Sequence, residues 1–182
     1  MQWKVLESTY ISHHPYFTAR KDRCLRPDGK VVPEYFVVEL PTSVCVLPLT
    51  ERHEVVMIRQ YRHPIGETIL EIPGGFVDKR EDPAQAIRRE LLEETGYAFE
   101  EVIPLGRTAA NPGVLNNYTG LFLARNGRKV QAQALDPNED IEVVLVPLEE
   151  VKRMLLAGEI IQSMHALCMF YALLTLGQIT VG

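Results

Sequence analysis

The sequence lacks the patterns that mark disulfide-rich, zinc-binding and membrane-spanning proteins. Its three cysteines, Cys24, Cys45 and Cys168, lie far apart and form no CxxC pair, so reduced, buried thiols are expected rather than a disulfide framework or a zinc knuckle. No apolar run approaches the ~18 residues of a membrane span. The first residues also lack the charged segment and apolar run of a secretory signal. We therefore expect a cytoplasmic protein.

Positive charge is also scarce. Lys plus Arg number 19 against 24 Asp plus Glu, a net charge of -5, and no long basic run indicates a groove for polymeric nucleic acid. Hydrophobic residues at 46% and charged residues at 24% are typical of a folded globular protein. The length of 182 residues suits one domain, or one domain with a small extension. Neither nucleic-acid polymers nor membranes are expected as partners.

Acidic residues concentrate on one predicted helix that begins near Pro83. Asp82 is a suitable N-cap, and Pro83 suits the first helical position. Gly96 falls where a left-handed C-terminal cap is expected. Both ends of the helix are therefore predicted from local signals.

Three glutamates of this helix stand at i, i+3 and i+4 and so share one stripe: Glu90, Glu93 and Glu94. An adjoining stripe is apolar and is expected to face the core: Ala84, Ile87 and Leu91. Three carboxylates on one rigid face suit Mg2+ or Mn2+, and Arg89 is placed to brace one of them. Taken alone, such a stripe is also typical of a solvated helix surface.

The spacing of this stretch resembles the signature of the Nudix hydrolases. Gly75 is followed after five residues by Glu81, and after seven more by the run Arg89-Glu90-Leu91-Leu92-Glu93-Glu94-Thr95-Gly96. A chance match at eight positions has a probability of roughly 10^-9 per starting point with average residue usage. Tyr97 stands where the family usually has an aliphatic residue, which concerns packing and leaves the acids unchanged.

Apolar runs and turn signals predict strands around this internal helix, at residues 35–40, 43–47, 55–59, 68–72, 102–107, 118–123 and 142–146. Two further helices are predicted at 149–157 and 163–176, the second so apolar that the sheet or another subunit must cover it. This order indicates an α+β fold with a mixed sheet between helices, and the resemblance implies the α/β/α sandwich of Nudix hydrolases. We expect residues 1–40 to be an N-terminal β extension and candidate dimerisation element, and residues 41–182 to be the Nudix hydrolase domain.

The resemblance implies a metal-dependent hydrolysis. Nudix hydrolases cleave a nucleoside diphosphate linked to another moiety by attack of water on phosphorus, with divalent cations neutralising the phosphates. The candidate ligands for two or three Mg2+ ions, with Mn2+ as the alternative, are the Gly74 carbonyl, Glu90, Glu93, Glu94 and Glu139. The candidate catalytic residues are Glu90, Glu93, Glu139 and Arg89, with Glu81 in a supporting role.

Three glutamates are candidates for the general base. Glu139 lies on an acidic loop before a predicted strand, where ADP-ribose pyrophosphatases carry a metal-binding or catalytic glutamate. Many of those enzymes have a second glutamate two residues earlier, and here that position is Pro137. Glu90, Glu93 and Glu139 therefore compete as the base, and a solvated loop acid is the alternative interpretation of Glu139.

Three features outside the motif resemble the branch that acts on ADP-ribose and other nucleoside diphosphate sugars: Gln60-Tyr61-Arg62, Glu71-Ile72-Pro73-Gly74-Gly75, and Pro112. The candidate substrate-binding residues are Arg62, Gly75 and Pro112, and Arg62 is suited to bidentate phosphate binding. The implied reaction is Mg2+-dependent hydrolysis of the pyrophosphate bond, giving a nucleoside monophosphate and a sugar phosphate. The alternatives are a nucleoside triphosphate pyrophosphohydrolase and a non-catalytic module that senses nucleotide sugars.

The same branch commonly forms homodimers in which the N-terminal part of one subunit completes the site of the other. Tyr16 and Phe17 are candidates for stacking on a base, with core packing as the alternative. His165, on the last predicted helix, is expected to be a structural histidine rather than a catalytic one.

Overall fold

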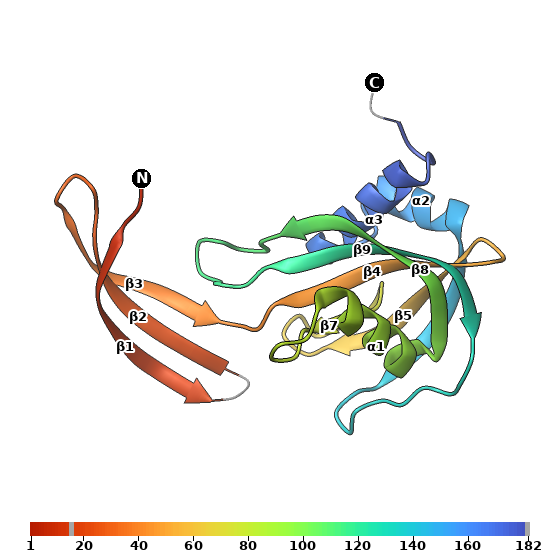
Figure 1. Cartoon of the computed structure of the whole chain (residues 1–182), viewed down its shortest axis with the longest axis horizontal. Helices are drawn as coiled ribbons and strands as arrows, with labels where there is room; N and C mark the ends of the chain where they lie inside the picture. The colour runs from red at the N-terminus through yellow and green to blue at the C-terminus, as the bar shows by residue number, and fades with distance from the viewer. Residues whose placement is uncertain (15–16, 181–182) are drawn as a thin grey trace. The chain divides into compact units, whose positions relative to one another are not determined.

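The computed structural model describes residues 1–14 and 17–180, which form two compact units (Figure 1). One unit comprises Met1–Thr42 and Ala109–Tyr118, and the other comprises Ser43–Thr108 and Thr119–Gly182. Within the described ranges, no helix has the length and apolar character needed to cross a membrane. Tyr16 lies outside the described residues.

The smaller unit is an antiparallel sheet in the order β1 (Lys4–His14), β2 (Phe17–Leu25) and β3 (Val31–Glu39). A turn at residues 26–30 joins β2 to β3, and Gly29 adopts a left-handed φ of 81° there. Val38 of β3 donates its N–H to the Val114 carbonyl at 2.8 Å. This bond ties the loop 109–118 to the small sheet.

The larger unit contains a mixed sheet in the order β10-β5-β4-β9-β8, with β6 paired to β5 and β7 to β4. Its strands are β4 (Ser43–Thr50), β5 (Glu54–Arg62), β6 (Glu67–Glu71), β7 (Gly74–Phe76), β8 (Tyr97–Thr108), β9 (Thr119–Lys129) and β10 (Ile141–Pro147). The pair β4 and β9 is parallel, whereas the other pairs are antiparallel.

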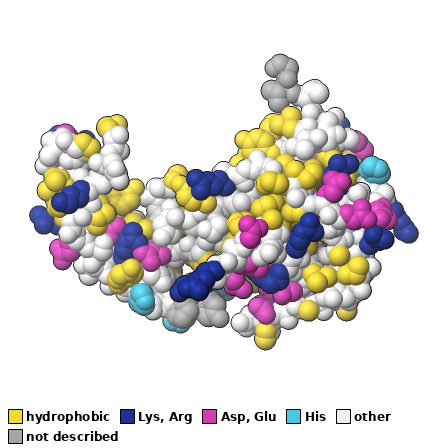
Figure 2. Space-filling view, viewed as in Figure 1, with side chains coloured by type: hydrophobic (Ala, Val, Ile, Leu, Met, Phe, Trp, Pro, Cys, Tyr) yellow, Lys and Arg dark blue, Asp and Glu magenta, His cyan; other side chains and the backbone are white. Residues whose placement is uncertain are grey.

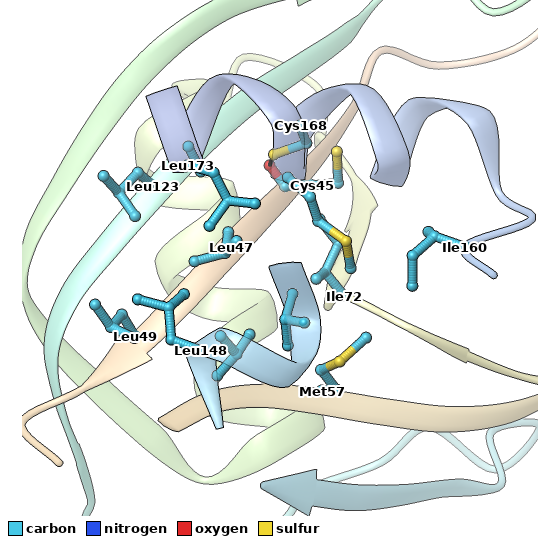
Figure 3. Close-up of a cluster of buried hydrophobic side chains, with 14 of the residues drawn as sticks. Cys45, Leu47, Leu49, Met57, Ile72, Leu123, Leu148, Ile160, Cys168 and Leu173 are labelled. Atoms are coloured by element: carbon cyan, nitrogen blue, oxygen red, sulfur yellow. Dashed lines mark hydrogen bonds between the residues drawn. The ribbon is translucent and has the colours of Figure 1, made fainter. Parts of the chain in front are cut away.

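Helices cover both faces of this sheet, α1 (Pro83–Thr95) on one side and α2 (Leu148–Leu156) with α3 (Ser163–Thr175) on the other. Alternate side chains of β4 pack into the two hydrophobic cores, one on each face of the sheet, because successive strand side chains point to opposite faces. Val44 and Val46 pack with α1, while Cys45 and Leu47 pack with α2 and α3. Figure 3 shows the second cluster beneath Cys168 and Leu173 of α3. The predicted α/β/α sandwich is confirmed, and α3 is covered by the sheet.

Several predicted strands were too short. The run expected at 102–107 is part of β8, which starts at Tyr97, directly after the helix cap. Exposed polar residues such as Glu100 and Glu101 interrupt the apolar pattern, because β8 is an edge strand with one face partly in solvent. In the predicted β extension at residues 1–40, only the strand at 35–40 was given bounds, whereas β1 and β2 are long strands as well.

Candidate functional site

The acidic helix α1 has the predicted ends. Asp82 accepts a hydrogen bond from the Ala84 N–H at 2.9 Å, and Gly96 has a φ of 73° and donates its N–H to the Leu92 carbonyl at 3.0 Å. The buried face is centred on Ala86, Ile87 and Leu91, whereas the predicted Ala84 lies half-buried at its border. The acidic stripe adjoins this face, and its Glu94 is itself buried.

The acidic stripe faces a cavity of about 340 Å³ within the larger unit, which we call the acidic cavity. Its lining comprises six acids (Asp78, Glu90, Glu93, Glu94, Asp136 and Glu139), two arginines (Arg62 and Arg89) and five other residues (Gln60, Gly74, Gly75, Phe76 and Ala134). Figure 2 shows acidic and basic side chains side by side over the region of α1. Carboxylates from α1 and from the loop before β10 therefore share one space.

Burial and mutual repulsion change the acidity of two of these carboxyls. Glu94 is only 4% exposed, and burial followed by the charge of Glu90 raises its pKa to about 8. Burial also raises the pKa of Glu90, against the opposing effect of Arg89, and the charges of Glu93 and Glu139 add to the rise. Without a cation, the cavity thus disfavours the ionised forms of Glu90 and Glu94.

Arg89 holds the outer side of this acid group together. Its Nε donates to Glu81 at 3.0 Å, and its Nη1 donates to Glu90 and to Glu93, each at 3.0 Å. Its Nη2 donates to the carbonyl of Phe76 at 3.1 Å. The hydrogen bond from Arg89 lowers the pKa of Glu81, and the same bonds raise the pKa of Arg89. Arg89 therefore braces three carboxylates, where the sequence suggested one.

Two glycines bring the backbone of β7 close to the carboxylates. A Cβ on Gly75 would collide with the Glu90 carboxylate, and one on Gly74 would collide with the Val44 carbonyl of β4. The Gly74 N–H donates to Glu94 at 3.2 Å. Both glycines therefore allow β7 to lie against the carboxylate of Glu90 and the backbone of β4.

The loop that carries Glu139 is fastened to the C-terminal end of α1. Gln133 donates through Nε2 to the Glu94 carbonyl at 2.7 Å and to the Ile141 carbonyl at 3.0 Å, while the Ala134 N–H donates to the Glu93 carbonyl at 2.9 Å. The Glu139 carboxylate accepts the Asp136 N–H of its own loop at 2.9 Å. These bonds hold Glu139 at the cavity, opposite the acidic stripe.

The donor chemistry of the acidic cavity fits a hard divalent cation. Among residues 1–14 and 17–180, no three His, Cys, Asp or Glu side chains already converge on a single metal position. The carboxylates of Glu90, Glu94 and Glu139 nevertheless repel one another around one cavity, and oxygen ligands of this kind are what Mg2+ and Mn2+ prefer. A cation would replace that repulsion by attraction.

Comparison with known proteins adds independent evidence. A profile described as NUDIX domain matches residues 39–167, and one described as nucleoside diphosphate sugar hydrolase N-terminal domain matches residues 3–38. The chain belongs to the Nudix family.

Named relatives span most of this Nudix protein. It is 33% identical over 136 residues to the methanol dehydrogenase activator of Bacillus methanolicus, with 74% of each chain covered. It is 32% identical over 146 residues to the ADP-ribose pyrophosphatase of Bacillus subtilis strain 168, covering 80% of this chain and 78% of that protein. A solved structure of an ADP compounds hydrolase shares the fold, with a TM-score of 0.84 over 98% of both chains at 19% identity.

The remaining sequence candidates divide between the two units of the Nudix protein. Arg62 lines the acidic cavity with Gly75, whereas Pro112 belongs to the smaller unit, on the loop attached to β3. Asp78 and Asp136 also line the cavity and were not among the candidates. Their signal was present in the sequence, since each stands three residues before a glutamate in an acidic loop, Glu81 or Glu139.

The raised pKa of Glu94 predicts that the metal-free Nudix protein becomes less stable as pH rises. A carboxyl with a folded pKa of about 8, against an ordinary 4.5, binds its proton more tightly when folded. Its contribution to stability is therefore complete below the ordinary value and is lost as the pH rises through about 8.

Glu94→Gln should remove this dependence, since the amide carries no proton to lose. In thermal unfolding with chelator, the melting temperature of wild type relative to Glu94→Gln should fall by at least about 4 °C between pH 5 and pH 8.5. Glu149→Gln, which alters an exposed side chain of α2, is the control, and its melting temperature should follow that of wild type with pH. Parallel curves for wild type and Glu94→Gln would contradict the assignment.

Proposed function

We propose that this protein hydrolyses the pyrophosphate bond of nucleoside diphosphate sugars such as ADP-ribose, giving a nucleoside monophosphate and a sugar phosphate. The observation that carries the proposal is the acidic cavity, in which several carboxylates, with Glu94 buried among them, and Arg62 line the same space. The ADP-ribose pyrophosphatase named among the relatives and the matching N-terminal profile support this class of substrate. The aqueous phase of the cytoplasm is the proposed location.

The proposed cofactor is Mg2+, with Mn2+ as the alternative, in two or three ions. Glu90 and Glu94 are the proposed principal ligands, supported by Glu93, Glu139 and the Gly74 carbonyl. Bound divalent cations supply charge neutralisation of the phosphates and a lowered pKa of bound water. The raised pKa values of Glu90 and Glu94 support this role, because both carboxylates need a positive partner.

The arginines have separate proposed roles. Arg62 meets a phosphate of the substrate, since a guanidinium binds phosphate oxygens through two parallel N–H bonds. Arg89 keeps the carboxylates in place and is fully engaged with them. Gly75 leaves the space that Glu90 occupies. Pro112, the third candidate from the sequence, belongs to the smaller unit.

In the proposed reaction, a water oxygen forms a bond to one phosphorus and the bridging phosphorus–oxygen bond on that phosphorus breaks. The proton of the water passes to a carboxylate, for which we propose Glu139. Glu90 and Glu94 are committed to cation binding in this scheme, and Glu93 accepts a hydrogen bond from Arg89. Glu139 accepts a bond only within its own loop among the described contacts, so it is available to take a proton.

A homodimer is the proposed assembly. Within the described part of the smaller unit, buried side chains are few (Ala19, Asp22 and Cys24), while large apolar side chains are exposed along all three strands (Val5, Leu6, Tyr10, Ile11, Phe17, Val31, Tyr35 and Phe36). So much exposed apolar surface on a thin sheet is typical of an interface. The smaller unit is therefore the proposed dimerisation element.

Substrate identity is tested by a panel of ADP-ribose, GDP-mannose, ATP and GTP with Mg2+, with the products separated by chromatography. We expect AMP or GMP together with a sugar phosphate. Glu90→Gln and Glu94→Gln should each lower turnover at least about 100-fold, with the fold unchanged by circular dichroism, while Glu149→Gln stays near wild type.

Near-normal activity of both glutamine variants would refute the cation-site assignment. Pyrophosphate released from the triphosphates alone would instead identify a nucleoside triphosphate pyrophosphohydrolase. A protein that binds nucleotide sugars and converts none of the panel would be a sensing module.

The base assignment is tested by Glu139→Gln beside Glu93→Gln. Loss of a general base should lower kcat of the Glu139 variant, measured at saturating Mg2+, by about 10²–10⁴-fold. Glu93→Gln should retain kcat within about tenfold. The reverse pattern would transfer the role to Glu93.

The dimer is tested by light scattering after size exclusion. We expect a mass of twice the 20.6 kDa chain, and a shift toward the single chain in Phe36→Asp, which places a charge among exposed apolar side chains of the smaller unit. Lys30→Asp, in the turn before β3, is the control and should remain dimeric. A single chain in wild type at working concentration would contradict the proposal.

A further inference from the structure

A buried carboxylate adjacent to the acidic cavity is not used by the proposed chemistry. Glu71, the last residue of β6, has a fully buried side chain at 0% exposure. Its Oε1 accepts a hydrogen bond of 2.7 Å from Nε of Arg62. Placing a charged carboxylate in a dry interior is unfavourable unless its oxygens are paired, so the environment of its second oxygen matters.

The second oxygen faces a histidine of α3. Oε2 of Glu71 lies 3.5 Å from Nδ1 of His165, a residue of α3 that is 6% exposed. In the part of the chain that the structure describes, neither atom has a hydrogen-bond partner. The Nδ1 of His165 is thus buried without a hydrogen bond.

A proton between these two atoms resolves the contact. Two bare acceptors facing each other in a dry site would repel, whereas one proton turns them into a donor and an acceptor. Burial lowers the pKa of His165 to about 3, so the ring is neutral and carries one proton. With that proton on Nδ1, a small rotation of either side chain brings 3.5 Å into hydrogen-bond range.

The contact with Glu71 determines how Arg62 is oriented. Glu71 engages only Nε of Arg62 among the hydrogen bonds of the described residues, so both terminal nitrogens are left for the acidic cavity that Arg62 lines. Arg62 also lies close enough to Glu94 to oppose the rise of its pKa. An unrestrained Arg62 would be drawn onto the cavity carboxylates, where it would compete with a cation for the same oxygens.

We propose that His165 and Glu71 are positioning residues for Arg62. His165 orients the Glu71 carboxylate, and Glu71 holds the guanidinium so that its two terminal nitrogens meet a phosphate of the substrate instead of pairing with Glu94. The kinetic effect expected from this positioning of Arg62 rests on the proposed hydrolysis. The brace itself is a property of the metal-free, substrate-free protein.

The brace is tested first without substrate. In nuclear magnetic resonance spectra of the metal-free protein, the Arg62 Nε–H should give a downfield, slowly exchanging signal, as for a guanidinium bonded to a buried carboxylate. His165→Leu should broaden or shift this signal, whereas His165→Asn, which keeps a donor near the position of Nδ1, should retain it. An absent signal in wild type, or an unchanged one in His165→Leu, would overturn the proposal.

The kinetic test uses ADP-ribose with Mg2+. His165→Leu should raise KM about tenfold or more with a smaller change in kcat, as for loss of a supporting partner, and His165→Asn should restore most of the effect. In an Arg62→Ala background, His165→Leu should raise KM by less than about twofold, because the arginine that His165 positions is gone. An equal effect in both backgrounds would show general destabilisation and overturn the proposal.

Glu71→Gln serves where His165→Leu does not fold. It keeps the shape and an acceptor oxygen, so it should move the Arg62 Nε–H signal upfield and raise KM about threefold or more; no change in either would overturn the proposal. A wild-type protein that hydrolyses no nucleotide sugar would refute the proposed function, while the Nε–H signal would still decide the brace.

Discussion

Repulsion among carboxylates that share one cavity is the constraint on which the site depends. Glu90 and Glu94 extend from a single rigid helix, Glu139 faces them from a fastened loop, and burial denies Glu94 the water that would otherwise screen it. Arg89 offsets the charge on the outer side only, and the Gly74 N–H contributes a single bond. On the inner side, ionised Glu90 and Glu94 lack such partners, and a divalent cation would stabilise their ionised forms, as the proposed function requires.

Local rules account for the part of the site that sequence could predict. The 3.6-residue period alone places Glu90, Glu93 and Glu94 on one stripe, and the caps at Asp82 and Gly96 follow from side-chain and backbone chemistry within a few residues. The mixed sheet and the helices that flank it followed from apolar runs and their order, and the family follows from the motif and the matching profile. These features need little knowledge of tertiary contacts.

Contacts between distant segments account for what sequence could not predict. Glu71 belongs to the segment that leads into the motif, and nothing near it in the chain indicates that a histidine of α3 lies beside it. The need for Gly75 arises from Glu90, which reaches it only after α1 packs against the sheet. Strand ends were missed in the edge strand β8, where exposed polar residues interrupt the apolar pattern. Pro112 lies in the smaller unit.

Proton release on cation binding tests the central claim most directly. A carboxyl with a pKa of about 8 is largely protonated at pH 7, so a cation that takes Glu94 as ligand must displace that proton. Calorimetric titration with Mg2+ at pH 7, in two buffers of different ionisation enthalpy, should show about one proton released in wild type and almost none in Glu94→Gln. Binding without proton release, or equal release in both proteins, would contradict the account.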